Sequence, residues 1–553
     1  MAEAGVATFD EWCEEAATRF LQSVLVVDDL ATFEPPPKPG EVAEPDPGAA
    51  VARDENDDDD DGAATAPPEI PLDVKVLGDA LADRGLSCGV LRPDREDPGG
   101  RRVVPAASRA DIVLLDWRLH DRGERVLEFI AQLAACDGLR LIVVYTSAGG
   151  LADIADQIAE RLAALGDCEH EPGSFRVTSA SLVVEVYSKE GALLHGAEEK
   201  REVRVQELAG RLIGDFVGLT RGLLPSATVA AIGELRAATP RILENLGADL
   251  DPAYLGHRIL LPDPDESGDQ LIKLIASEWG VAIEDNEMVR RAVGLEPIDA
   301  YIDQLEPRDG ELSADTLKRV VRVGIKSDSA KKQLNDIPEV NRANPKLVGA
   351  RESQTSRFMR SDDGSAHKSD QAFALRLLHK TTTPNVSPRL TLGTIVRDDE
   401  GRYLICVQPG CDSVRLGGAR SFPFLPMKQP KNGNVPDVLV EDDGELVELA
   451  VVRDPYELLS IPFEPDSTGA VVADGRGPGA KFRGPDKERD EGSDGERDEG
   501  SDKEPEARMF SFVAQLRKSH AQNVAHQLAQ KLGRVAVDRS EVQQLWKKRG
   551  DGS

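Results

Sequence analysis

The sequence has few aromatic residues, few cysteines and no long apolar run. The last two shortages argue against disulfide-rich secreted proteins and membrane-spanning proteins. Aromatic residues make up 4% of the 553 residues, and there are 6 cysteines. Cysteines this sparse indicate free thiols in a reducing compartment. Apolar runs stay well short of the roughly 20 residues that cross a bilayer. The acidic N-terminus lacks the layout of a signal peptide. We therefore expect a soluble, cytoplasmic protein with no membrane partner.

Positive charge is also in short supply. The chain has 67 Lys and Arg against 99 Asp and Glu, which gives a formal net charge of -32. Such a surface repels nucleic acid and anionic membranes, so we expect neither as a general partner. Cys406 and Cys411 form a lone C-x4-C pair. Because no second pair lies nearby, we interpret them as core residues rather than as zinc ligands.

The length predicts several domains, separated by stretches that cannot form a core. Residues 31–70 are rich in Pro, Ala and acid, and residues 484–507 hold the repeats ERDEGSDG and ERDEGSDK. We expect both stretches to be disordered. The predicted order is a domain at 1–220 that contains the 31–70 insertion, a helical domain at 221–350, a linker and helix at 351–385, a β-rich domain at 386–483, an acidic linker at 484–507, and a C-terminal strand and helices at 508–553.

Short apolar segments alternate with helical patterns in the first domain. The predicted strands are residues 23–29, 88–91, 111–116, 141–146 and 181–189. The predicted helices are residues 14–22, 73–84, 124–134, 151–162 and 205–216. This alternation predicts an α/β fold with a doubly wound, five-stranded parallel sheet. In the helical domain the clearest helices are 228–246 and 268–279, and the β-rich domain is expected to be α+β.

Polar side chains stand at the ends of four of these strands, where such sheets place their functional residues. Asp28 and Asp29 follow the first strand, Asp116 ends the third, Thr146 the fourth and Lys189 the fifth. Three clustered carboxylates repel one another unless a divalent cation such as Mg²⁺ lies between them. A carboxylate nucleophile, a cation and two donors are what phosphoryl transfer onto Asp116 requires.

Each of these residues alone has a simpler interpretation. An acid or a Thr after a strand is often a helix cap, and a Lys at a strand end is often solvated. The joint order of acidic pair, acid, hydroxyl and amine favours a site.

This order resembles the receiver domain of two-component response regulators, which has a flavodoxin-like fold. The resemblance implies that Asp116 is phosphorylated by a sensor histidine kinase. It also implies that Mg²⁺ is held by Asp28, Asp29, Asp116 and the backbone carbonyl of Arg118. Thr146 and Lys189 are then expected to bind the phosphoryl oxygens.

The sequence departs from the receiver pattern in several places. The insertion at 31–70 lengthens the step from Asp29 to Asp116, and the segment before Lys189 is also longer than usual. Glu190 follows Lys189 where receivers commonly have Pro, and Val186 stands where they often have an aromatic residue. These departures favour phosphate acceptance over the usual aromatic switching.

Segments of the remainder resemble large receiver-containing proteins of bacterial anti-phage two-component systems such as Detocs. They are GLLPSATVAAIGELR, DLDPAYLGHRILL, LTLGTIV, YLICVQPGCDSVRL and FPFLPM. The chain has no nucleosidase, nuclease or protease signature. The resemblance therefore implies a phosphate relay or buffer, without enzymatic activity beyond its own phosphorylation and dephosphorylation. A separate effector protein is an expected further partner. Whether the chain forms a homodimer stays an open question.

Three alternative functions compete with this interpretation. Residues 524–533 and 539–548 resemble a helix-turn-helix, which would make a DNA-binding response regulator, but Arg539 falls where the second helix needs an apolar residue. An enzymatic output in residues 220–553 lacks support, because its histidines form no catalytic motif. They are His257, His367, His379, His520 and His526. A phosphorylation-independent scaffold would not need three clustered carboxylates.

Overall fold

The computed structural model forms two compact units, residues 1–309 with 313–333 and residues 310–312 with 334–553. The described residues are 7–34, 70–95, 100–120, 123–136, 138–166, 168–179, 182–261, 264, 266–305, 312–324, 332, 363–381, 385–431, 435–486 and 507–533. Most of the predicted insertion at 31–70, most of the acidic repeat at 484–507 and the second helix of the helix-turn-helix pattern lie outside them.

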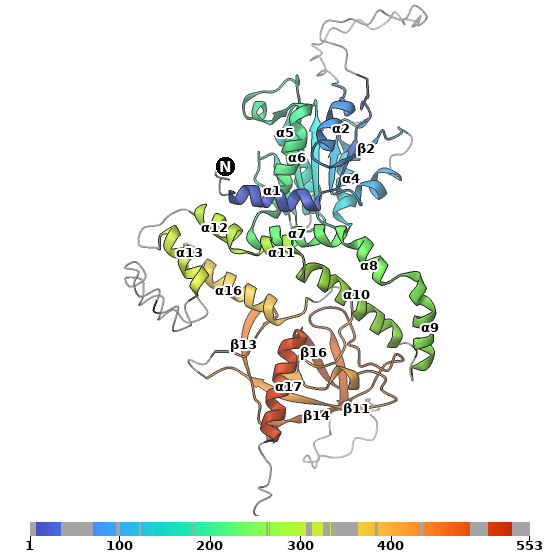
Figure 1. Ribbon diagram of the computed structural model, residues 1–553, viewed down its shortest axis with the longest axis vertical. Coiled ribbons are helices and arrows are strands. Elements are labelled where there is room, and N and C mark those ends of the chain that lie inside the picture. The colour runs from blue at the N-terminus through green and yellow to red at the C-terminus, as the bar shows by residue number, and fades with distance from the viewer. Residues whose placement is uncertain are drawn as a thin grey trace, which may run out of the picture. The chain divides into compact units, whose positions relative to one another are not determined.

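A parallel sheet forms the centre of the first unit (Figure 1). Five of its parallel strands lie in the order β2 (Ser87–Leu91), β1 (Ser23–Val27), β3 (Ile112–Leu115), β4 (Arg140–Thr146) and β7 (Leu182–Lys189). They correspond to the five predicted strands, and their order is that of flavodoxin-like doubly wound sheets. The α/β class of this part of the chain is therefore confirmed.

The prediction of five strands was wrong, because the sheet has eight. The additional strands are β5 (Cys168–Glu169), β6 (Arg176–Ser179) and β8 (Glu202–Val203). They span two, four and two residues, too short for an apolar pattern to reveal them. β6 runs antiparallel to β7 at residues 183–185, and β8 runs parallel to it at residues 188–189. The outer edge of β7 is thus paired in both halves.

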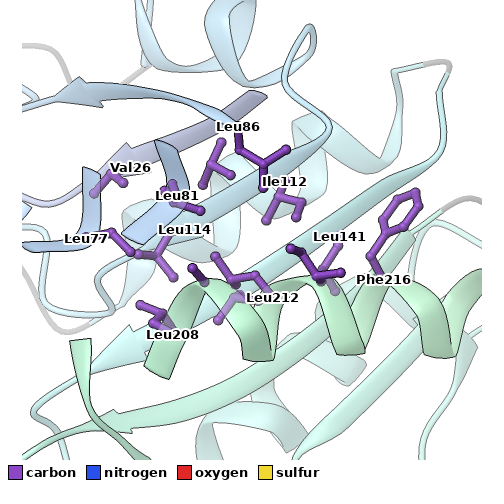
Figure 2. Close-up of a cluster of buried hydrophobic side chains, with 14 of the residues drawn as sticks. Val26, Leu77, Leu81, Leu86, Ile112, Leu114, Leu141, Leu208, Leu212 and Phe216 are labelled. Carbon is purple, nitrogen blue, oxygen red and sulfur yellow. The ribbon is translucent and has the colours of Figure 1, made fainter. Parts of the chain in front are cut away.

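Helices cover both faces of this sheet because its strands are apolar on both sides. One face packs against α1 (Phe9–Phe20), α2 (Val74–Ala82) and α6 (Val205–Thr220). The other packs against α3 (Val103–Ala107), α4 (Glu124–Ala134) and α5 (Leu151–Ala163). Figure 2 shows the first core, which contains Leu114, Leu81 and Leu212. Its neighbour Leu115 enters the second core, as strand geometry requires.

The helices after the sheet begin with α7 (Leu223–Ala237), which packs closely on α1. A Cβ atom on Gly233 would lie 2.7 Å from the carbonyl oxygen of Arg19, so glycine is needed at this contact. The predicted helix 228–246 is in fact two helices, since α8 spans Thr239–Asn245. Pro240 lies in the first turn of α8. Proline is tolerated there because an N–H in the first turn has no acceptor within the helix, so its loss breaks no helical hydrogen bond.

Five further α-helices complete the described part of the first unit. They are α9 (Asp251–Leu260), α10 (Glu266–Glu284), α11 (Glu287–Ala292), α12 (Leu295–Asp303) and α13 (Ala314–Val323). The predicted helix 268–279 lies within α10. Among the described residues, no single helix is long and apolar enough to cross a membrane, although α6 and α7 meet that criterion as a pair bent by 119°.

The described part of the second unit contains a β-sheet and two α-helices, in agreement with its prediction as β-rich. The sheet order is β12 (Val438–Asp442), β13 (Glu445–Val451), β11 (Arg420–Lys428), β10 (Tyr403–Cys406), β9 (Thr394–Arg397), β16 (Ala507–Gln515) and β15 (Lys481–Asp486), and β14 (Leu459–Phe463) also pairs with β11. The pairs are antiparallel. The helices are α16 (Asp363–Leu378) and α17 (Lys518–Gly533). Separate apolar clusters lie on the two faces of the sheet.

We predict that deleting residues 35–68 leaves the first unit folded. Thr32 pairs with Asp73, since its N–H donates to the carbonyl of Leu72 at 2.9 Å and its carbonyl accepts from Val74 at 2.9 Å. These bonds join β1 to α2 without the deleted residues. A shorter connection costs less entropy to close. The free energy of unfolding should therefore stay the same or rise by up to about 2 kcal/mol.

Urea denaturation followed by circular dichroism measures this change. Thr32→Pro is the comparison, because it removes the N–H that bonds Leu72 and should lower stability by about 1–3 kcal/mol. Loss of cooperative unfolding in the deletion variant would show that the prediction is wrong.

Candidate functional site

The register of the parallel strands brings the predicted acidic residues together. Val27, the last residue of β1, pairs with Leu115, the last residue of β3. The N–H of Asp116 continues this pairing by donating to the carbonyl oxygen of Val27 at 2.9 Å. Asp28 and Asp116 therefore follow neighbouring strand ends at the same edge of the sheet. Both are buried, with 2% and 4% of their surface exposed.

Asp29 completes a cluster of three carboxylates. One carboxylate oxygen each from Asp28, Asp29 and Asp116 can be chosen so that all three lie within 4.8 Å of one another. Burial raises the pKa of Asp28 above its ordinary value; Lys189 opposes this shift, and the charge of Asp116 adds to it. The cluster thus concentrates negative charge where water screens it poorly.

Lys189 projects from the end of β7 into this cluster. Its ammonium nitrogen Nζ lies 2.8 Å from Asp28 Oδ2, 2.8 Å from Asp116 Oδ2 and 3.1 Å from the carbonyl oxygen of Ile70. The residue is 1% exposed. Burial alone would lower the pKa of Lys189, but the charges of Asp116 and Asp28 outweigh it and raise that pKa. Lys189 is therefore held as a cation between two carboxylates.

Thr146 ends β4, the strand between β3 and β7. It is fully buried, and its hydroxyl oxygen accepts a hydrogen bond from the N–H of Ala148 at 3.2 Å. Among the described contacts it makes no hydrogen bond to the three aspartates. The structure therefore places Thr146 at the end of the strand that adjoins β3, with no described hydrogen bond to the cluster.

The loop after β3 closes one side of the cluster. The N–H of Arg118 donates to Asp116 Oδ1 at 3.3 Å, so the chain turns back over the carboxylate that precedes it. His120 in the same loop contacts Asp29: its Nδ1 lies 2.7 Å from Asp29 Oδ2. His120 was not predicted from the sequence. Its position four residues after Asp116, in a loop that starts at the site, was the available signal.

Val186 and Tyr187, near the end of β7, point to opposite faces of the sheet. Val186 belongs to the core beside α4 and α5, and Tyr187 to the core beside α2 and α6. The Tyr187 hydroxyl donates to both carboxylate oxygens of Asp215, at 3.1 and 2.9 Å, and accepts from Arg211 at 2.7 Å. The ring of Tyr187 is thus held in the core beside α2 and α6, on the other face of the sheet from Val186, the expected switch position.

The chemistry of the cluster fits a small, hard cation. Its donors are carboxylate oxygens, the ligands that Mg²⁺ and Ca²⁺ prefer. Three carboxylates and one ammonium leave an excess of negative charge, which a divalent cation would balance. Asp28, Asp29 and Asp116 are the side chains that could hold such an ion.

Comparison with known families agrees with this geometry. Residues 20–193 match the family model of the response receiver domain. This range contains the parallel strands β1, β2, β3, β4 and β7 and the acidic cluster. No curated protein and no solved structure matches the chain. The chain therefore contains a receiver domain.

We predict that Lys189→Met destabilises the first unit. The substitution leaves Asp28 and Asp116 buried next to each other without a cation, and breaking a buried ion pair in this way costs about 3–5 kcal/mol. Urea denaturation at neutral pH without divalent cations measures the loss.

Lys75→Met is the matched control. Lys75 is likewise paired with a carboxylate, since its Nζ lies 2.6 Å from Asp79 Oδ2, but this pair lies on the exposed surface of α2. It should leave stability unchanged. An equally small effect of Lys189→Met would contradict the role of Lys189 as the cation that neutralises the cluster.

Proposed function

We propose that the receiver domain accepts a phosphoryl group on Asp116 from a sensor histidine kinase, in a reaction that requires Mg²⁺. The observation that supports this most is the joint placement of three carboxylates and Lys189 at the carboxyl edge of the sheet. Receiver domains generally interact with histidine kinases and use Mg²⁺. The residues that such a reaction needs are present in this chain.

The surroundings of the three carboxylates favour Asp116 as the nucleophile. Both oxygens of Asp28 are engaged, Oδ1 by the N–H of Leu30 at 2.7 Å and Oδ2 by Lys189. Asp29 lies at the rim of the cluster, where 14% of its side chain is exposed. Asp116 follows the strand between β1 and β4, and among the described contacts its Oδ1 accepts one long hydrogen bond, of 3.3 Å from the N–H of Arg118. This oxygen is the one best placed to attack.

In the proposed transfer, a carboxylate oxygen of Asp116 forms a bond to the phosphorus of a phosphohistidine. The bond between that phosphorus and the kinase imidazole breaks, and the imidazole leaves with the electron pair of that bond. Bound Mg²⁺ would balance the charge of the phosphoryl oxygens. Lys189 offers its ammonium to the same oxygens, and the hydroxyl of Thr146 offers a donor from β4.

A role as relay or buffer is the output that we favour. The chain showed no effector-enzyme signature, so a separate effector protein is the expected recipient of the signal. A place in an anti-phage two-component system stays a prediction, which rests on the resemblance of short segments. For the DNA-binding alternative, the first helix of the pattern lies in α17, whereas residues 539–548 lie outside the described part. The net charge of -32 opposes that alternative.

We predict that Asp116→Asn abolishes phosphorylation. The amide cannot act as the nucleophile, although it matches the carboxylate in size. Acetyl phosphate with Mg²⁺ should label the wild-type chain, as seen by intact-protein mass spectrometry, and beryllofluoride should occupy the same site.

Asp94→Asn, in an exposed loop position after β2, is the control and should be labelled like the wild type. Label that persists on Asp116→Asn would rule out Asp116 as the acceptor.

We further predict that Thr146→Ala slows labelling of Asp116. Removing one donor that stabilises developing charge typically costs about 100-fold or more in rate, and partial replacement by water reduces the loss here to about 10–100-fold. Thr146→Ser keeps the hydroxyl and should label at nearly the wild-type rate. Equal rates for the Ala variant and the wild type would exclude a role for the hydroxyl.

A further inference from the structure

His120 joins three loops at the carboxyl edge of the sheet. It lies in the loop after β3, and its Nδ1 is 2.7 Å from Oδ2 of Asp29, which follows β1. Its other ring nitrogen, Nε2, is 2.7 Å from the carbonyl oxygen of Pro93, which follows β2. The His120 side chain is 15% exposed and that of Asp29 14%. One imidazole ring thus connects the ends of three neighbouring strands.

The two contacts fix the orientation of the ring. A carbonyl oxygen can only accept, so Nε2 carries a proton and donates it to Pro93. Nδ1 lies within hydrogen-bonding distance of the Asp29 carboxylate, 2.7 Å from Oδ2. The Asp29 carboxylate is therefore tied through Oδ2 to a ring that is itself held by the backbone.

The backbone of His120 supports a specific role for this residue. Its φ is 59°, in the left-handed region that residues other than glycine seldom adopt. Such a conformation costs free energy and persists where the surrounding contacts impose it, which is often at a functional site. Here the conformation turns the imidazole towards Asp29.

Each carboxylate of the cluster is held by described contacts. Asp28 is held by Leu30 and Lys189, and Asp116 by the backbone of Arg118 and by Lys189. For Asp29, the described side-chain partner of the carboxylate is His120.

We propose that His120 is a positioning residue that holds the Asp29 carboxylate in the orientation that binds Mg²⁺. This inference rests on the proposed phosphoacceptor site and adds a residue that supports its metal ligands. Groups that orient metal ligands in this way typically change metal affinity about 10–100-fold when they are removed. Because His120 contacts Asp29 and not Asp116, its loss should weaken Mg²⁺ binding and spare the chemical step.

The test is His120→Asn in the full-length chain. Asn tolerates a positive φ, so the substitution removes the imidazole with little added backbone strain. The half-saturating MgCl₂ concentration for labelling of Asp116 by acetyl phosphate should rise about 10-fold, while the rate at saturating Mg²⁺ stays unchanged. A purely structural role would instead lower that maximal rate or the thermal stability. His120→Gly, which also accepts a positive φ, should behave like the Asn variant.

His170→Asn is the matched control. His170 also joins a carboxylate to a backbone carbonyl, with Nε2 2.6 Å from Asp156 Oδ1 and Nδ1 2.9 Å from the carbonyl oxygen of Arg176, but it lies between α5 and β6. The half-saturating MgCl₂ concentration of the His170→Asn variant should match that of the wild type. An unchanged or lower half-saturating concentration in His120→Asn would overturn the proposal, and so would a lower maximal rate at unchanged Mg²⁺ dependence.

Isothermal titration with MgCl₂ alone separates this inference from the proposed function. If the wild type binds Mg²⁺ but Asp116 is never labelled, the phosphoacceptor proposal fails, and the role of His120 is decided by whether its Asn variant binds Mg²⁺ about 10-fold more weakly. If the wild type binds no Mg²⁺, the role of His120 is overturned as well.

Discussion

Two buried carboxylates placed side by side are the constraint on which the rest of the site depends. Asp28 and Asp116 follow adjacent parallel strands, so the sheet itself keeps them together. Their mutual repulsion is strong because little water reaches them. Lys189, held 2.8 Å from each, offsets that repulsion in part. Any ligand that brings positive charge to this edge relieves the remainder, and a phosphoryl group on Asp116 would change the balance again.

The parallel strands and the residues at their ends could be predicted from the sequence, because both leave local patterns. A run of apolar residues such as 111–116 that ends in a polar one identifies a buried strand and its tip together. The strand order then follows from general rules for doubly wound sheets. Asp28, Asp116 and Lys189 needed no long-range information beyond that order for their placement to be predicted.

Features that depend on distant contacts could not be predicted. β5 and β8 span two residues each, and their pairing partners alone define them as strands. The break between α7 and α8 lies within a continuous helical pattern. His120 acquires its importance from Asp29 and Pro93, which are far away in the sequence. The segment between Thr146 and Lys189 is longer than in the usual receiver pattern because the β5–β6 hairpin lies between α5 and β7.

The helix α7 attaches to the opposite end of the sheet from the acidic cluster. Arg236 of α7 lies 3.4 Å from Asp111 Oδ1 and stacks on the ring of Phe20. The other oxygen of Asp111 accepts from the N–H groups of Gln22 and Ser23, at the start of β1. This network therefore fixes α7 at the amino ends of β1 and β3. The carboxyl ends, where phosphoryl transfer is proposed, are separated from it by the full length of the strands.

The paired outer edge of β7 restricts how another protein can recognise this domain. β6 and β8 use the backbone hydrogen-bonding groups that a strand at the border of a sheet would otherwise present. A partner cannot lengthen the sheet by adding its own strand next to Lys189. Recognition on this side would have to read side chains on helices and loops. Side-chain recognition of that kind distinguishes related partners more sharply than backbone pairing does, because every strand offers the same main-chain groups.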